Sequence, residues 1–136
     1  MILVADDNQD MLSFVVRQLE DNYIVLTAKD GLEALEVLDN QEVTLVVSDV
    51  VMPRMDGFEL CKVVKSKLDY SHIPVILLTA KTNIQSKIEG LELGADAYIE
   101  KPFSVEYLQA CIANLINSRE KLRQAFAQSP FVAANT

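Results

Sequence analysis

Short apolar runs alternate with amphipathic stretches along most of this chain. The runs are rich in β-branched side chains, which is typical of strands. In the amphipathic stretches, apolar residues recur at three- and four-residue intervals, which is typical of helices with one buried face. The pattern predicts strands at residues 1–6, 23–28, 45–49, 75–79 and 97–100. It predicts helices over residues 9 to about 22, 30–40, 56 to about 68, 83–93, and from 104 onward.

The spacing also predicts which helical residues face the core and where some helices begin and end. The predicted inward residues are Met11, Leu12, Val15 and Leu19 in the first helix, Leu60, Val63, Val64 and Leu68 in the third, and Ile84, Ile88 and Leu91 in the fourth. Asp30 and Asp56 each stand three residues before a glutamate, which predicts a helix N-cap at both. Gly94 is placed for a left-handed stop after the fourth helix.

Strict alternation of five strands with five helices predicts an α/β fold, with a parallel sheet covered by helices on both faces. The run at 45–49 is apolar up to its final residue, so it is expected in the middle of that sheet. The flavodoxin-like strand order 2-1-3-4-5 fits five such units and right-handed crossovers. Alternation alone also permits other orders.

Length and charge narrow the class of protein. A chain of 136 residues suits one domain, and half of its residues are apolar. Its net charge of −8 argues against direct nucleic-acid contact, which needs a basic patch. No run is long and apolar enough for a membrane span, and we expect no membrane contact. Cys61 and Cys111 are expected to be small core residues in a reducing cytoplasm.

Polar side chains follow four of the predicted strands: Asp6 and Asp7, Asp49, Thr79 and Lys101. In a parallel sheet these ends share one edge, so the three carboxylates converge if the first and third strands are neighbours. Carboxylates that close cannot all stay ionised without a cation. Because the ligands are all oxygens, the sequence predicts Mg²⁺.

Asp49 is either a loop cap or a reactive group, since an unpaired carboxylate after a buried strand is costly to desolvate. Aspartate is an established covalent nucleophile. Mg²⁺ and the Lys101 ammonium would neutralise an arriving phosphoryl group, and the Thr79 hydroxyl could bond one of its oxygens. We therefore predict phosphoryl transfer to Asp49.

Several spaced motifs carry a family resemblance. They are Asp6-Asp7, the apolar strand into Asp49, Met52-Pro53 with Gly57 eight residues after Asp49, Thr79-Ala80, Gly94-Ala95-Asp96, and Tyr98 three residues before Lys101-Pro102-Phe103. Over residues 1–118 the sequence resembles the receiver domain of two-component response regulators. The resemblance implies the flavodoxin-like order, with a receiver domain at 1–118 and a helical extension, linker or tail at 119–136.

The resemblance assigns chemical roles by position. It implies that Asp49 accepts a phosphoryl group from a histidine on a sensor histidine kinase or a histidine phosphotransfer domain. It implies that Asp6, Asp7 and Asp49, together with the backbone carbonyl of Val51, are the Mg²⁺ ligands.

The resemblance also implies a conformational switch. Thr79 and Lys101 would bind the phosphoryl oxygens, and Thr79 and Tyr98 would form a switch pair. Their movement would remodel the face of the fourth helix, fifth strand and fifth helix. A homodimer through that face is a further expectation.

The end of the chain departs from a minimal receiver. Residues 118–126 continue the last helix before Ser129-Pro130 breaks it. A helix from residue 104 to 128 would be roughly 37 Å long. We interpret this stretch as a linker toward an output domain. Its sequence resembles that of receivers in hybrid sensor proteins, where an AraC-type DNA-binding domain follows. A frayed helix end is the alternative.

Three rival functions fit the residues less well. A Mg²⁺-dependent aspartyl phosphatase generally has a second acid where this chain has Val51. A flavin carrier of the same fold needs a Ser-, Thr- and Gly-rich phosphate loop where this chain has Asp6-Asp7-Asn8. A receiver-like scaffold that has lost phosphorylation is disfavoured because every expected group is present. We expect a cytoplasmic signalling switch that promotes its own phosphorylation and dephosphorylation, and not a stand-alone enzyme.

Overall fold

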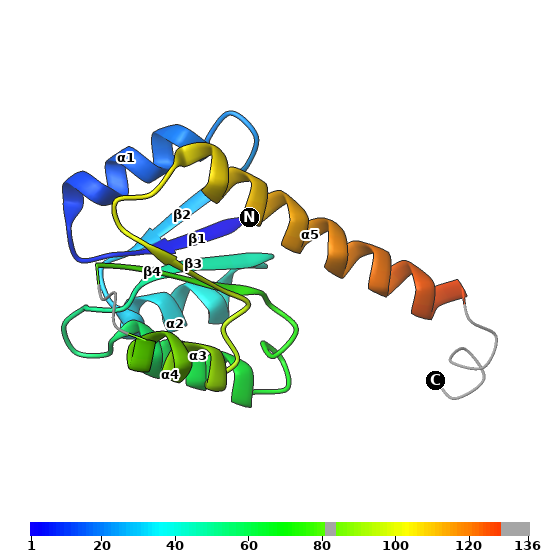
Figure 1. The fold of residues 1–136 in the computed structure, drawn as a ribbon. Helices are drawn as coiled ribbons and strands as arrows, with labels where there is room; N and C mark the ends of the chain where they lie inside the picture. Colours follow the sequence, from blue (N-terminus) through cyan, green and yellow to red (C-terminus); the bar gives the residue numbers. More distant parts are fainter. Residues whose placement is uncertain (81–83, 129–136) are drawn as a thin grey trace.

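A computed structural model describes residues 1–80 and 84–128 of the chain. Within these residues, parallel strands form one sheet in the order β2-β1-β3-β4-β5 (Figure 1). The strands are β1 (Ile2–Ala5), β2 (Val25–Ala28), β3 (Leu45–Asp49), β4 (Val75–Thr79) and β5 (Ala97–Glu100). The helices are α1 (Gln9–Leu19), α2 (Gly31–Asn40), α3 (Gly57–Ser66), α4 (Ile84–Glu92) and α5 (Val105–Gln128). The predicted fold class and strand order are confirmed.

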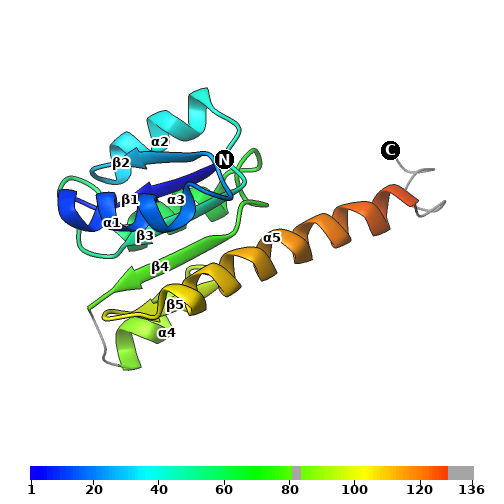
Figure 2. The ribbon, with the colours of Figure 1, turned by 90° about the horizontal axis from the view of Figure 1, so that it is seen from above.

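The sheet separates two apolar layers. Helices α1 and α5 cover one face, and α2, α3 and α4 cover the other (Figures 1 and 2). Successive residues of β1 divide between the layers, because side chains alternate across a strand. Ile2 and Val4 pack with α1 and α5, whereas Leu3 and Ala5 pack with α2 and α3. The central strand β3 is paired on both sides, and its apolar residues are fully buried.

The predicted helix ends are largely confirmed. The Asp30 carboxylate accepts the backbone N–H of Glu33 at 2.9 Å, and Asp56 forms a reciprocal capping box with Glu59. Gly94 follows α4 with a φ of +96°, in the left-handed region where a side chain is disfavoured. These local signals place the start of two helices and the end of a third.

Some predicted boundaries are wrong by a few residues. Helix α1 ends at Leu19 instead of near residue 22, and β2 begins at Val25 instead of residue 23. Leu68, predicted to face the core, is 90% exposed because α3 already ends at Ser66. The remaining predicted inward residues of α1 and α3 are buried or half-buried.

The predicted inward stripe of α4 is wrong. Ile84, Ile88 and Leu91 are 70%, 41% and 56% exposed. The buried position is Gly90, where an added Cβ would lie 3.0 Å from the ring of Tyr98. Because glycine lets the helix backbone approach the tyrosine closely, it sets which face of α4 turns inward. The predicted start of this helix at Asn83 lies outside the described residues.

Helix α5 runs back along the sheet and continues past the body of the molecule (Figure 2). Where it leaves, Arg119 donates to Asp96 Oδ1 at 2.9 Å. The other oxygen, Asp96 Oδ2, accepts from Lys65 Nζ at 2.9 Å and from the backbone N–H of Val75 at 2.8 Å. One carboxylate thus ties α5 to α3 and β4. Across the two described ranges, no helix combines the length and apolarity needed to cross a bilayer.

The first testable prediction compares two leucines that the sequence assigned to one buried stripe. Leu60 is fully buried and Leu68 is 90% exposed. Leu60→Ala should lower the free energy of unfolding by about 2–5 kcal/mol, because it leaves a cavity in the core. Leu68→Ala should change it by less than about 0.5 kcal/mol. Urea unfolding followed by circular dichroism measures both, and equal losses would contradict the assigned burial.

Candidate functional site

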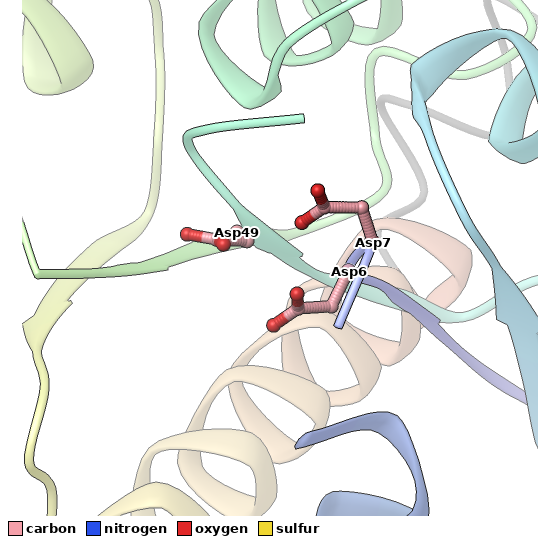
Figure 3. Close-up of side chains that lie close together, drawn as sticks. All are labelled: Asp6, Asp7 and Asp49. Atoms are coloured by element: carbon pink, nitrogen blue, oxygen red, sulfur yellow. The ribbon is translucent and has the colours of Figure 1, made fainter. Parts of the chain in front are cut away.

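The three predicted acids meet at the carboxyl edge of the sheet. Strands β1 and β3 are neighbours, with Ala5 paired to Ser48, so Asp6 and Asp49 follow at the same level. Asp7 comes next in the chain after β1. One carboxylate oxygen from each aspartate lies within 4.8 Å of the others, and the side chains gather around a common point (Figure 3).

Lys101 brings a positive charge to this cluster from the end of β5. Its Nζ lies 3.2 Å from Asp6 Oδ2 and 3.5 Å from Asp49 Oδ2. The backbone N–H of Lys101 donates to the carbonyl of Thr79 at 2.8 Å. This bond holds the Lys101 backbone against the end of β4, and the side chain starts from there. Asp6 is buried, so this amine offsets part of the cost of desolvating its carboxylate.

Asp49 lies in an environment that disfavours its charge. Burial raises the pKa of its carboxyl, the Lys101 ammonium opposes that rise, and the negative charge of Asp6 adds to it. Asp49 Oδ1 accepts the backbone N–H of Val50 at 2.8 Å. Asp49 Oδ2, the oxygen nearer Lys101, is the one that faces positive charge. A cation or an electrophile at this oxygen would relieve the unfavourable environment.

A cavity of about 240 Å³ opens beside the cluster. It is lined by Asp49, Val51, Thr79, Ala80 and Lys101. These residues come from the ends of β3, β4 and β5, so the sheet edge itself forms the walls. The volume is several times the roughly 30 Å³ that one water occupies, which is room for a small hydrated oxyanion.

The sequence profile described as the response regulator receiver domain matches residues 2–113. The chain belongs to this family. It is 38% identical over 131 residues to "Histidine kinase P4" of Formosa agariphila, covering 96% of this chain and 10% of that protein. It is 40% identical over 116 residues to "Response regulator MprA" of a Mycobacterium species, covering 85% of this chain and 50% of that protein. The chain therefore spans between a tenth and half of these relatives.

Solved structures agree with the family assignment. The receiver domain of a signal transduction histidine kinase from Syntrophus aciditrophicus superposes with a TM-score of 0.81 at 34% identity. The match covers 86% of this chain and 89% of that one. The fold and the family of this receiver domain are thus both established.

The loop after Asp49 shows why a glycine stands eight residues beyond that acid. The backbone N–H of Gly57 donates to the carbonyl of Val50 at 2.8 Å, which closes the loop on itself. A Cβ at position 57 would lie only 2.2 Å from the Asp49 carbonyl oxygen. Only glycine therefore lets α3 begin this close to the backbone of Asp49.

Tyr98 lies outside the cavity lining. It is half-buried on β5, packed against the core and the backbone of Gly90. Burial raises the pKa of its hydroxyl, and the charges of Glu100 and Glu89 act in the same direction. The structure thus brings together the predicted residues Asp6, Asp7, Asp49, Val51, Thr79 and Lys101. It places Tyr98 on the adjoining strand.

One polar contact near the site was missed by the sequence reasoning. Asp30 was interpreted only as a helix cap, yet it also forms an ion pair with Arg54 in the loop after Asp49. The two residues are 24 positions apart, and no local pattern links them. The pair becomes visible only in the folded structure, where the loop after β3 lies against the start of α2.

The second prediction concerns pH and stability in the metal-free protein. Folding raises the pKa of Asp49, so the folded state binds this proton more tightly than the unfolded chain. The ionised carboxylate therefore costs stability above the raised pKa, and the cost disappears as the pH falls below about 4. Asp49→Asn should raise the free energy of unfolding at neutral pH, and this gain should shrink toward low pH.

Urea unfolding in the presence of a chelator, repeated from neutral to acid pH, measures this difference. Glu42→Gln is the matched control, because it neutralises an exposed carboxylate outside the cluster. An Asp49→Asn protein that is less stable than the wild type at neutral pH would refute the prediction.

Proposed function

We propose that this receiver domain is a phosphoacceptor switch in a two-component phosphorelay, with Asp49 taking a phosphoryl group from a histidine. The donor would be a sensor histidine kinase or a histidine phosphotransfer domain. The observation that carries the proposal is the cluster of three carboxylates within 4.8 Å beside an amine 3.2 and 3.5 Å from two of them. The adjoining cavity has room for the arriving group.

The donor set fits Mg²⁺. All the candidate ligands are oxygens, they lie close together, and two are buried or half-buried at a sheet edge. In this proposal Asp6, Asp7, Asp49 and the backbone carbonyl of Val51 hold the ion. When bound, Mg²⁺ supplies positive charge that lets an anionic phosphoryl group approach an anionic carboxylate.

Asp49 needs no general base, because its carboxylate is the nucleophile in its ionised form. One of its oxygens bonds to phosphorus as the phosphorus–nitrogen bond to the donor histidine breaks, and the imidazole leaves with the electron pair and takes up a proton. Lys101 and Thr79 bind the phosphoryl oxygens from the cavity wall.

The switch and output belong to the same proposal. Thr79 would move toward the phosphoryl group, and Tyr98 would turn inward beside Gly90, changing the face made by α4, β5 and α5. That face would serve an output domain or a homodimer contact. Residues 1–118 would act as the receiver and 119–136 as the connection to a DNA-binding output in cis. We place these events in the cytoplasm, where ATP-dependent kinases operate.

The third prediction tests the acceptor. Incubation with acetyl phosphate and Mg²⁺ should add one phosphoryl group to the wild type, and Asp49→Asn should abolish labelling because the nucleophile is gone. Asp56→Asn is the matched control, since asparagine keeps the helix cap while removing a nearby acid. Intact-protein mass spectrometry measures both. Label on the Asp49→Asn protein would contradict the assignment, and rapid multiple-turnover release of phosphate would favour the aspartyl phosphatase instead.

The fourth prediction tests the metal site. Asp7→Ala should weaken Mg²⁺ binding by about tenfold or more, because it removes a charged oxygen ligand. Asp10→Ala removes an exposed acid three residues further on, outside the cluster, and should leave the affinity nearly unchanged. Isothermal titration calorimetry gives the dissociation constants. Equal affinities for the wild type and the Asp7→Ala protein would remove the metal assignment.

A further inference from the structure

The loop between β3 and α3 is a closed ring that carries Val51 to the cavity. The bond from Gly57 N–H to the Val50 carbonyl, 2.8 Å long, closes the ring. Met52 enters the core and is buried, which holds one side of the ring. A ring held on one side alone could still tilt about that anchor. The orientation of Val51 therefore depends on what holds the opposite side, residues 53–56.

That opposite side is held by the start of α2. The Arg54 guanidinium donates from Nε to Asp30 Oδ2 at 2.8 Å, and its second nitrogen lies 2.7 Å from the same oxygen. Asp30 Oδ1 is used separately, accepting the N–H of Glu33 at 2.9 Å. The Asp30 side chain is only 6% exposed, so protein groups, with Arg54 and the Glu33 N–H foremost, satisfy its charge in place of water.

Two further observations show that the contact is built rather than incidental. Arg54 has a φ of +64°, a left-handed conformation that is disfavoured for a residue with a side chain. The N–H of Gly31 donates to the Met55 carbonyl at 2.9 Å, and a Cβ on Gly31 would lie 2.5 Å from Met55 Cγ. The loop backbone thus rests directly on the first turn of α2. The backbone N–H of Glu33 lowers the pKa of the Asp30 carboxyl most, burial opposes that shift, and the Arg54 guanidinium lowers the pKa further.

We propose that Asp30 and Arg54 are a positioning pair for the phosphoryl site, holding the loop so that the Val51 carbonyl faces the carboxylate cluster. This inference rests on the proposed function, since it assigns the pair to that site. Neither residue touches the metal or the phosphoryl group in this account. They act through the loop backbone, in the way that outer partners of metal ligands tune affinity.

The charge of Arg54 makes the inference sharply testable. Removing a nearby positive charge should by simple electrostatics tighten Mg²⁺ binding, because like charges repel. Releasing the loop should weaken binding, because one oxygen ligand is misplaced. The two effects have opposite signs for Arg54, so the direction of the change decides between them.

Two variants isolate the pair with little other damage. Arg54→Gly removes the guanidinium while keeping a residue that tolerates a positive φ. Asp30→Asn removes the charge while keeping the helix cap, since asparagine caps as well as aspartate. We expect each to weaken Mg²⁺ binding by about tenfold, and the double variant to be no weaker than either single one. Arg54→Lys, which restores the charge, should recover part of the affinity.

The measurements are calorimetric Mg²⁺ affinity, the initial rate of Asp49 labelling, and amide hydrogen exchange at Gly31 in the metal-free protein. Exchange at Gly31 should accelerate in both single variants, because its bond to Met55 is loosened. Arg123→Gln is the matched control, since it breaks an exposed ion pair with Glu120 on α5. It should change none of these readouts.

The outcomes separate this inference from the proposed function. Unchanged or tighter Mg²⁺ binding by the Arg54→Gly protein, at a temperature where it is fully folded, would overturn the inference even if its unfolding free energy falls. A wild type that neither binds Mg²⁺ nor becomes labelled at Asp49 would overturn the proposed function, and this inference with it. Weaker binding in both single variants with a non-additive double variant supports the positioning pair.

Discussion

Electrostatic repulsion among three carboxylates is the constraint around which this domain is built. Parallel pairing of β1 with β3 forces Asp6, Asp7 and Asp49 to one edge. Within the described residues, the ammonium of Lys101 is the positive charge that contacts this cluster directly. One amine cannot balance three negative groups, so the edge retains an excess of negative charge. An attraction for cations is therefore a property of the folded chain, set by strand order before any partner arrives.

Much of this arrangement could be predicted from the sequence because the informative residues stand at strand ends. Buried parallel strands read as continuous apolar runs, so the polar residue that ends each run is conspicuous. Asp49 and Thr79 were identified in this way, and alternation of strands with helices implied a shared edge. The strand order needed the family resemblance, because alternation alone permits other orders.

The features that the sequence did not reveal depend on contacts between distant segments. The inward face of α4 is set by Gly90 against Tyr98, and a pattern of apolar residues cannot show that a glycine will be buried in place of isoleucines. The ion pair of Asp30 with Arg54 spans two loops and leaves no periodic signal. As a result, α4 presents apolar side chains to the surface and buries little of its own area. A helix held by so little apolar burial costs little free energy to displace.

The direction of α5 has a consequence for how the domain fits into longer proteins. The helix leaves the body beside Asp96, just before β5 begins, and Met1 lies at the same end of the sheet, before β1 (Figure 1). The carboxylates lie at the far end, about 17 Å away along a five-residue strand. Met1 and the point where α5 leaves the body thus share the end of the sheet that is remote from the carboxylate cluster. The cavity beside Asp49 therefore opens at the end of the sheet opposite Met1 and the exit of α5.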